Sequence, residues 1–344
     1  MRNRDLADPE YARRLERFAA IAAPDSPLSA AFARAAANDP ISHEILSGAP
    51  ASLPAANVLL AAVQYLLLSG VDDDLADHYP SIARTPTSQR GDPGEQFLAF
   101  CRNHRGRIAE LVSSRGVQTN EVRRCVVLVP ALAGIGEGPL ALVEIGASGG
   151  LNLCFDCYRY DFGGALTGPD SPLTLTTEIR SGAPPIPDPL PAVAWRVGID
   201  LEPIDFYDPD AVLWARALIW PEQLDRIARF KAAMEIVRLD PPPIIRGDAL
   251  EVLPGVLKDA PTDATLVVFH SFVLNQFTPE GREQFDTVLR DASDDRAIHR
   301  VSFEILRPEL AYPEVVHTVY RNGEATDRLL GRAHQHGAWL EWAE

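Results

Sequence analysis

Cysteine is scarce in this sequence, with four residues in a chain of 344. So few cysteines cannot cross-link a chain of this length, which excludes a disulfide-stapled scaffold. Two of them, Cys154 and Cys157, form a C-x-x-C pair that could be a redox dithiol or half of a zinc site. No second C-x-x-C and no histidine pair at zinc-finger spacing follows. We therefore interpret both as ordinary, apolar-leaning thiols on one helix face.

The sequence also has little that resembles a secretion signal or a membrane span. The first twenty residues carry charges throughout and contain no apolar core, so we expect no secretory signal and a cytoplasmic protein. The longest apolar run, residues 53–70, contains Asn57 and Gln64 and has a proline at its start. These interruptions favour a buried helix over a membrane-spanning one.

Positive charge is in the minority, with 32 Lys and Arg against 48 Asp and Glu and a net charge of −16. This field opposes non-specific binding to nucleic acid or to an anionic membrane, so neither is an expected partner. A small-molecule substrate, or a ligand that carries positive charge, is easier to accommodate. The hydrophobic content of 46% suits a globular protein of about two domains, and the oligomeric state stays open.

The first part of the sequence is helical in pattern. Apolar residues recur at spacings of three and four from about residue 8 to residue 132, and prolines break the run at intervals. No strand-like alternation interrupts it. The pattern predicts an all-helical N-terminal domain or cap over residues 1–132.

After residue 133 the pattern changes to short apolar segments separated by amphipathic stretches. The segments are ALVEIG, AVAWRVGID, IIRGDAL, TLVVFHS and HRVSFEIL. They predict an α/β domain over 133–344, with a Rossmann-like, doubly wound, mostly parallel sheet and an antiparallel C-terminal hairpin. Residues 162–191 are rich in Gly and Pro with one possible strand, LTLTTEI, and we expect an insertion or lid there.

The stretch LVEIGASGGLNL at 142–153 places small residues in the first strand-to-helix turn. The strand should end at Glu144 or Ile145 and the next helix should begin near Gly150. A backbone without bulky side chains can approach a nucleotide or nucleoside closely, and a helix start offers free N–H groups. The dinucleotide pattern G-x-G-x-x-G is absent because Ser148 stands where the second glycine belongs, and no Walker lysine follows.

Carboxylates follow three successive predicted strands. Glu144 would repel a pyrophosphate but would pair with the amino group of S-adenosylmethionine. Asp200 offers two acceptor oxygens to the ribose hydroxyls. Asp248 stands where the adenine edge is expected, with Ala249 and Leu250 placed to pack on the ring. The three acids together predict S-adenosylmethionine as the cofactor.

The segments EIGASGG, GIDLEP, GDALEVLP and LVVFHS resemble those of Rossmann-like S-adenosylmethionine-dependent methyltransferases, whose sheet also closes with an antiparallel hairpin. Over nearly the full length, segments such as QTNEV, YRYDFG, WPEQLDRIARFKAA and AHQHGAWLEW resemble an uncharacterised bacterial family, domain of unknown function 2332, which has no established activity. The methyltransferase resemblance implies cofactor binding by Glu144, Gly146, Ala147, Ser148, Gly149, Asn152, Asp200, Leu201, Asp248 and Ala249.

The fourth predicted strand ends in His270 and Ser271, beside the expected position of the methyl group. His270 is the candidate catalytic base or acceptor-positioning residue, and Ser271 a candidate substrate contact. The alternative is a histidine that is hydrogen-bonded to neighbouring backbone and holds the loop.

QTNEV lies near the junction of the helical part and the sheet. We expect Thr119 or Asn120 to cap the helix that follows. Asn120 and Glu121 could still reach the cleft as substrate contacts. Tyr160, with Tyr158 and Asp161, could line the acceptor pocket, although aromatic residues here are equally consistent with core.

His334 and His336 alternate on a predicted strand and invite a metal-site hypothesis. No carboxylate or third histidine is close in sequence, and H-E-x-x-H is absent. We expect no metal and a turn at His336-Gly337.

The leading hypothesis is an S-adenosylmethionine-dependent methyltransferase acting on an unidentified small molecule. One alternative is a non-catalytic cofactor-binding or interaction protein, because FHSF stands where D/N-P-P-Y would follow the fourth strand. A less favoured alternative is a nicotinamide-dependent oxidoreductase, for which a pyrophosphate-type glycine pattern and a Tyr-x-x-x-Lys motif are missing.

Overall fold

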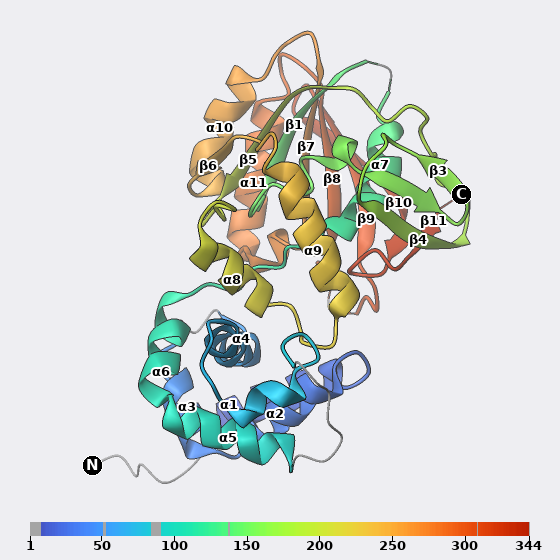
Figure 1. The fold of residues 1–344 in the computed structure, drawn as a ribbon. Coiled ribbons are helices and arrows are strands. Elements are labelled where there is room, and N and C mark those ends of the chain that lie inside the picture. The colour runs from blue at the N-terminus through green and yellow to red at the C-terminus, as the bar shows by residue number, and fades with distance from the viewer. Residues whose placement is uncertain (1–7, 51–52, 84–90, 137, 308, 344) are drawn as a thin grey trace. The chain divides into compact units, whose positions relative to one another are not determined.

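A computed structural model describes residues 8–50, 53–83, 91–136, 138–307 and 309–343. The chain forms two compact units, one of Met1–Thr119 with Tyr207–Ala228 and one of Asn120–Phe206 with Arg229–Glu344 (Figure 1). This division differs from the predicted ranges 1–132 and 133–344, which stay a prediction. Residues 125–133 pack within the second unit, and residues 207–228 within the first.

The first unit is helical, as the sequence predicts, and no strand occurs among its described residues. Asp-Pro or Ser-Pro pairs start most of its helices, because the first side chain accepts a free N–H of the first turn and proline presets the helical φ. The helices that begin this way are α1 (Pro9–Ala22), α2 (Pro27–Ala37), α3 (Pro40–Leu46), α5 (Pro93–Asn103) and α8 (Pro209–Ala217). The others are α4 (Ala55–Leu68), α6 (Arg105–Ser114) and the 3-10 helix η1 (Asp74–His78).

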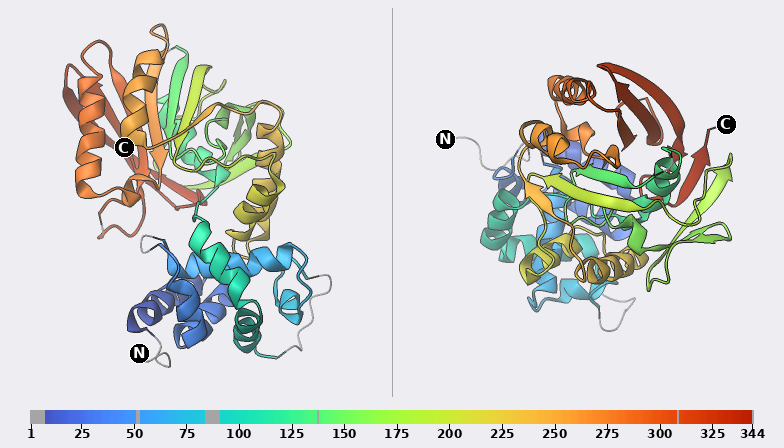
Figure 2. Two further views of the ribbon diagram at one scale, coloured as in Figure 1. Left: turned by 90° about the vertical axis from the view of Figure 1, so that its left-hand side faces the viewer. Right: turned by 90° about the horizontal axis from the view of Figure 1, so that it is seen from above.

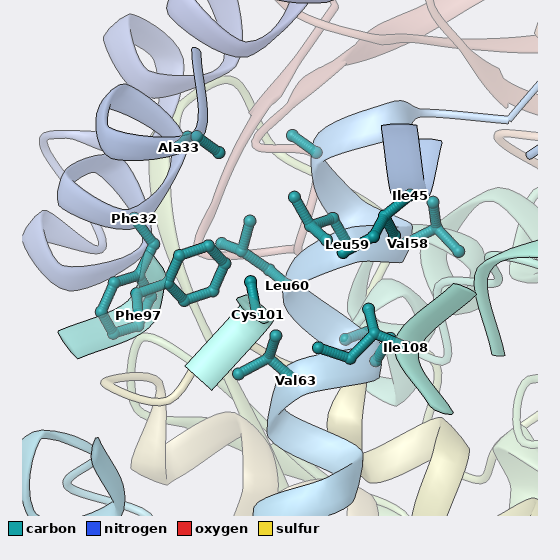
Figure 3. Close-up of a cluster of buried hydrophobic side chains, with 14 of the residues drawn as sticks. Phe32, Ala33, Ile45, Val58, Leu59, Leu60, Val63, Phe97, Cys101 and Ile108 are labelled. Carbon is teal, nitrogen blue, oxygen red and sulfur yellow. The ribbon is translucent and has the colours of Figure 1, made fainter. Parts of the chain in front are cut away.

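Helix α4 is the centre of this unit. Most of its side chains are buried, and Leu60 and Val63 point toward Phe32, Phe97 and Cys101 (Figure 3). The rings of Phe32 and Phe97 stack at 4.7 Å. The buried helix predicted within 53–70 is therefore confirmed. Among the described residues, no helix has the length and apolar content to cross a membrane.

The second unit is built on one sheet of eleven strands in the order β3-β2-β4-β11-β10-β9-β8-β7-β1-β5-β6. Its parallel half contains β1 (Leu140–Ile145), β5 (Val193–Asp200), β6 (Ile244–Arg246), β7 (Thr265–Ser271) and β8 (Ile298–Glu304). Counted along the chain, these strands have the 3-2-1-4-5 order of a doubly wound fold. The predicted fold class is confirmed.

The antiparallel half continues with β9 (Glu314–Arg321), β10 (Glu324–Ala333) and β11 (Trp339–Trp342). The β9–β10 turn is Asn322-Gly323, with φ of 53° and 75°, as two-residue hairpin turns require. Between β10 and β11, Gly337 has φ 68° and its N–H donates to the His334 carbonyl at 2.8 Å. The antiparallel tail and the turn at His336-Gly337 are both confirmed.

The predicted insertion at 162–191 contributes strands to the sheet, and the possible strand at LTLTTEI is confirmed. Its strands are β3 (Ala165–Thr167) and β4 (Thr174–Ser181), joined by the preceding β2 (Arg159–Phe162). β4 pairs in parallel with both β11 and β2. Alternating burial along β4 gives one covered face and one exposed face.

Helices cover both faces of the parallel half. Ala141, Val143 and Ile145 pack toward α10 (Ala249–Asp259) and α11 (Pro279–Asp291). The sheet curves around α7 (Cys125–Ala133) on its inner side, with α10 and α11 outside the curve (Figure 2). Every residue of β1 is consequently buried, which explains its unbroken apolar run and makes Glu144 an exception.

A pair of stacked histidines joins β8 to β9. The rings of His299 and His317 lie 5.2 Å apart, and Nδ1 of His299 is 2.9 Å from Nε2 of His317. Burial, with the neighbouring His317, lowers the pKa of His299 to about 4, and burial also lowers the pKa of His317.

Acid should therefore destabilise the protein through His299. The unfolded chain binds a proton near pH 6.5 and the folded chain only near 4, so this contribution is present above 6.5 and is lost as the pH falls. We expect His299→Phe to flatten the dependence of the free energy of unfolding on pH between 7 and 4.5 by up to about 2 kcal/mol, a value reduced for partial exposure. Chemical denaturation across this range measures it, and an unchanged slope would contradict the prediction.

Candidate functional site

The three predicted acids lie at the carboxyl ends of adjacent parallel strands. Glu144 is the last but one residue of β1, Asp200 ends β5, and Asp248 follows β6 by two residues. The strand order reverses between β1 and β7, and ligands of doubly wound folds bind outside such a reversal. The candidate site is therefore the set of loops that leave β1, β5, β6 and β7 at this edge.

The turn after β1 does not lead into a helix, so that expectation is wrong. Turns fill residues 147–154, and the first helical element is the three-residue 3-10 helix η3 (Phe155–Cys157). Gly146, Ser148 and Gly150 have φ of 71°, 54° and 77°, and left-handed residues at alternate positions cannot start an α-helix. No helix N-terminus is available here to a ligand.

Close packing explains the glycines of this turn. A Cβ on Gly146 would lie 2.8 Å from Cγ2 of Val273, and one on Gly149 would lie 2.2 Å from Cζ of Phe206. A Cβ on Gly150 would likewise lie 2.6 Å from Cγ of the buried Pro242. The turn is held between the segment after β5 and the segment after β7, so side chains of the protein already lie against its backbone.

Glu144 is a buried acid with an unsatisfied oxygen. Its side chain is on the α7 face, and its Oε1 accepts a hydrogen bond from Nδ2 of Asn152 at 3.3 Å. Asn152 Oδ1 in turn accepts from the thiol of Cys125 at 3.3 Å. Oε2 is buried and has no hydrogen-bond partner among the described residues. Burial raises the pKa of Glu144 well above its usual range, against the opposing effect of Asn152, so the protonated carboxyl is favoured.

Asp200 ties the glycine turn to the loop after β5. Its Oδ2 accepts the N–H of Ser148 at 2.7 Å and its Oδ1 accepts the N–H of Glu202 at 2.8 Å. The N–H of Ile204 donates back to the Ser148 carbonyl at 3.2 Å. Leu201, between these contacts, is 66% exposed.

Asp248 caps α10, and its Oδ1 accepts the N–H of Leu250 at 2.8 Å. Its side chain is exposed. Ala249 is buried in the core between α10 and the sheet. Asp248 therefore has an exposed carboxylate at the site edge, whereas Ala249 contributes to packing.

A group of buried charges lies before α7. Glu121 caps the 3-10 helix η2 (Val122–Arg124) by accepting the N–H of Arg123 at 3.1 Å, so the expectation that Thr119 or Asn120 is the cap is wrong. Glu121 Oε1 lies 3.8 Å from Nε of Arg229, and Oε2 lies 3.9 Å from Nδ1 of His336. Asn120 is buried beside it, and its Nδ2 has no hydrogen-bond partner within the described part of the chain.

Arg124 links this group to the end of β7. Its Nη1 donates to the carbonyl and hydroxyl oxygens of Ser271 at 3.2 and 3.3 Å, and its Nε donates to the Gln335 carbonyl at 3.2 Å. Its guanidinium lies 4.4 Å from the centre of the Phe272 ring. The sequence does not single out Arg124 or Arg229, because surface arginines on an amphipathic pattern look the same as buried ones, and it indicates only a turn at His336.

His270 lies on the opposite face of the sheet from Glu144. It pairs with Ile145, has no exposed surface and packs its ring edge against Phe285 at 5.8 Å. Its Nδ1 is 2.9 Å from Oε1 of Glu304. Burial lowers its pKa despite the opposing effect of Glu304, so the ring is neutral.

Glu304 connects His270 to the loop after β7. The same Oε1 accepts the N–H groups of Val273 and Leu274 at 2.8 and 3.1 Å. His270 and Glu304 together hold the loop that packs Val273 onto Gly146. This arrangement matches the loop-holding alternative, and direct contact of His270 with a substrate stays a prediction.

Tyr160 is part of the core behind the turn. It has no exposed surface, and its hydroxyl donates to the Phe155 carbonyl at 2.5 Å. Tyr158 is buried in the same way and donates to the Leu151 carbonyl at 2.8 Å.

The two histidines of the closing turn contact each other. The N–H of His336 donates to Nδ1 of His334 at 3.1 Å. The described residues contain no group of three His, Cys, Asp or Glu side chains placed to hold a metal ion.

A family model described as "Uncharacterized protein conserved in bacteria (DUF2332)" matches residues 12–342. No curated protein matches the chain. Among solved structures, one described as a "putative RNA methyltransferase" from Pyrococcus horikoshii is 12% identical, with a TM-score of 0.21, and the match covers 72% of this chain and 74% of that one. A TM-score this low carries no argument about activity, and RNA is named for that protein alone.

The buried carboxyl of Glu144 predicts an unusual dependence of stability on pH. The folded chain keeps the Glu144 proton at pH values where the unfolded chain has lost it, so this group reduces stability as the pH rises above the ordinary carboxyl pKa. Glu144→Gln keeps the acceptor for Asn152 and removes this cost. We expect the variant to be more stable than the wild type at pH 8, by about 1–2 kcal/mol, and to differ less at pH 5.

Chemical denaturation at both pH values measures the effect. Glu324→Gln, at an exposed position that starts β10, is the control and should change neither value. A Glu144→Gln variant that is less stable than the wild type at pH 8 would show that the carboxyl is held as a charged group.

Proposed function

Because the chain belongs to the DUF2332 family of uncharacterised bacterial proteins, which brings no activity with it, we propose a function from the site itself. The sheet unit binds S-adenosylmethionine at the carboxyl ends of β1, β5 and β6, and transfers its methyl group to a small molecule. The observation that carries this proposal is the buried, unsatisfied Oε2 of Glu144 beside the glycine turn.

A buried acceptor oxygen without a donor costs free energy, which a ligand donor would recover. The amino group of S-adenosylmethionine is such a donor, and it is positively charged. A pyrophosphate brought to the same place would add negative charge beside Asp200, whose carboxylate already disfavours the ionised form of Glu144. The electrostatics therefore support this cofactor over a nicotinamide dinucleotide.

The other acids of the site fit the remainder of the cofactor. Both oxygens of Asp200 accept backbone N–H groups, and a ribose hydroxyl is a further donor that such a carboxylate can accept. Asp248 keeps its exposed carboxylate at the neighbouring strand end. The Phe206 ring lies against Gly149, so the nucleoside would lie beside this ring.

When bound, the cofactor supplies an electrophilic methyl group on its sulfonium. The residues of the chain would bind and orient the acceptor from the α7 face, where the buried Asn120, Glu121 and Arg124 lie. Ser271, the last residue of β7, accepts a hydrogen bond from Arg124 at its hydroxyl oxygen. We propose His270 as a positioning residue, because it holds the loop after β7 through Glu304 and has no exposed surface.

Calorimetry with S-adenosylmethionine and S-adenosylhomocysteine tests cofactor binding. We expect both ligands to bind the wild type, and Glu144→Gln to weaken binding about tenfold or more, because a charge-assisted hydrogen bond is lost. Glu324→Gln should bind as the wild type does. An absence of binding to the wild type at millimolar ligand would refute the proposal.

Binding should also release a proton. Burial favours the protonated form of Glu144 in the free protein, whereas a bound ammonium group favours its charged form. We therefore expect affinity to rise from pH 6 to 7.5, by at most about tenfold per pH unit, and to be nearly independent of pH in Glu144→Gln. Calorimetry in buffers with different ionisation enthalpies counts the protons released. Equal pH dependence in both proteins would contradict the role given to Glu144.

The positioning role of His270 has its own test. His270→Ala leaves the buried Glu304 carboxyl without its imidazole partner, so we expect a destabilisation of about 2–4 kcal/mol and faster amide hydrogen exchange at Val273 and Leu274. His270→Asn can still donate to Glu304 and should restore much of the protection. If exchange at these amides were the same in His270→Ala and in the wild type, His270 would not hold the loop.

A non-catalytic cofactor-binding protein on the same fold is the second candidate. The full burial of His270 favours it, because no titratable group of β7 is exposed to accept a proton. Cofactor binding without turnover on any methyl acceptor would identify this case. Fluorescence titration with NADH separates both from a nicotinamide-dependent enzyme.

A further inference from the structure

The C-x-x-C pair lies just beyond the glycine turn and has no part in the proposed cofactor site. Cys154 precedes η3 and its carbonyl accepts the N–H of Cys157 at 2.9 Å. Cys154 is buried, at 3% exposure, whereas Cys157 is exposed. The expectation of two thiols on one helix face is therefore wrong, because the short 3-10 turn places one sulfur inside and the other at the surface.

The turn brings the two sulfurs within reach of each other. Residues at the first and fourth positions of such a turn have Cα atoms less than about 7 Å apart, which overlaps the range of about 4.4–6.8 Å found in disulfides. Cys154 and Cys157 are each the largest influence on the pKa of the other thiol, and the Cys157 thiol also donates to Oδ1 of Asp156 at 3.9 Å. A bond between the sulfurs needs little movement of the backbone.

A fixed arginine lies beside both thiols. Arg196 donates from Nη1 and Nη2 to the two carboxylate oxygens of Asp156, at 2.7 and 2.6 Å, and from Nη1 to the Leu153 carbonyl at 2.7 Å. These bonds anchor the turn from both sides of Cys154. The hydrogen bond from Cys154 and the charge of Arg196 lower the pKa of Cys157, whereas the shared hydrogen bond and burial raise that of Cys154.

We propose that Cys154 and Cys157 form a reversible dithiol–disulfide site that exchanges with small-molecule disulfides. The Cys157 thiolate attacks one sulfur of a disulfide R–S–S–R, forms a mixed disulfide and releases RS⁻. Cys154 then attacks Sγ of Cys157 and displaces the second RS⁻, which takes up the Cys154 proton. The protein dithiol loses two electrons, and the small disulfide is reduced to two thiols.

The remaining cysteines cannot take these roles. Cys101 and Cys125 have no exposed surface, and burial raises the pKa of each thiol. Exposure and thiolate character together select Cys157 as the attacking sulfur. Cys154 is the one cysteine that shares its turn, which makes it the resolving sulfur.

The site goes beyond the proposed cofactor binding and does not depend on it. Leu151 and Asn152 nevertheless connect the dithiol to the glycine turn. The Tyr158 hydroxyl donates to the Leu151 carbonyl, and Asn152 donates to Glu144. Formation of the disulfide would fix the turn from Cys154 to Cys157, which begins two residues after Asn152.

The full chain equilibrated in buffers of reduced and oxidised glutathione tests the proposal, with acid quenching, alkylation and peptide mass spectrometry. We expect the wild type to form the Cys154–Cys157 disulfide without accumulating a glutathione adduct. Cys154→Ser should instead accumulate glutathione on Cys157, and Cys157→Ser should leave Cys154 reduced. Cys101→Ala should behave as the wild type does.

Cys154→Ala serves the same purpose if the buried serine impairs folding, which circular dichroism reports. Iodoacetamide at pH 7 should modify Cys157 at least about tenfold faster than Cys101 or Cys125 in the native wild type. A stable glutathione adduct on wild-type Cys157, or both thiols still reduced in oxidised glutathione alone, would overturn the proposal. Either result would show that the two sulfurs do not exchange.

Discussion

The complete burial of β1 between helices on both faces of the sheet is the constraint on which the site depends. Its neighbours β5 and β7 pair with it in parallel along its whole length, so their carboxyl ends come to one edge. Everything that could contact a ligand leaves the sheet there, in loops whose starting points are fixed by the core. The turn with left-handed residues at Gly146, Ser148 and Gly150 then carries the chain away from the end of this buried strand.

The same burial sets the charge of Glu144. An acid near the end of a buried strand loses its hydration, and the hydrogen bond from Asn152 does not fully replace it. Burial therefore favours the protonated carboxyl, and a cationic ligand would favour the charged one. Asp200, in contrast, accepts backbone N–H groups at both of its oxygens. Two acids on neighbouring strands therefore have different roles.

Strand alternation separates the chemistry of the two faces. Glu144 faces α7, with Asn152 and Cys125, whereas His270 is directed to the α11 face with Phe285. The loop after β7 is where the two faces meet. Its backbone is bonded to Glu304 on one side, and Ser271 is bonded to Arg124 on the other. A change at His270 would reach the glycine turn through Val273, which packs on Gly146.

The sequence by itself determined the helical character of the first part of the chain, the five strands of the parallel half, the antiparallel tail and the presence of acids at three strand ends. These follow from periodicity and from turn chemistry, which act between residues close in the chain. The environment of each acid came only from the tertiary structure, because Asn152 and Cys125 reach Glu144 from separate elements.

Three features differed from expectation. They are the turn after β1, the cap at Glu121 and the unequal exposure of the thiols of Cys154 and Cys157. In each case the local pattern allowed two conformations, and packing against distant segments decided between them. Phe206 and Val273 against the glycine turn are the clearest example. A one-dimensional pattern specifies which residues are small or charged, but which face of the sheet a side chain occupies and whether water reaches it are set by contacts across the fold.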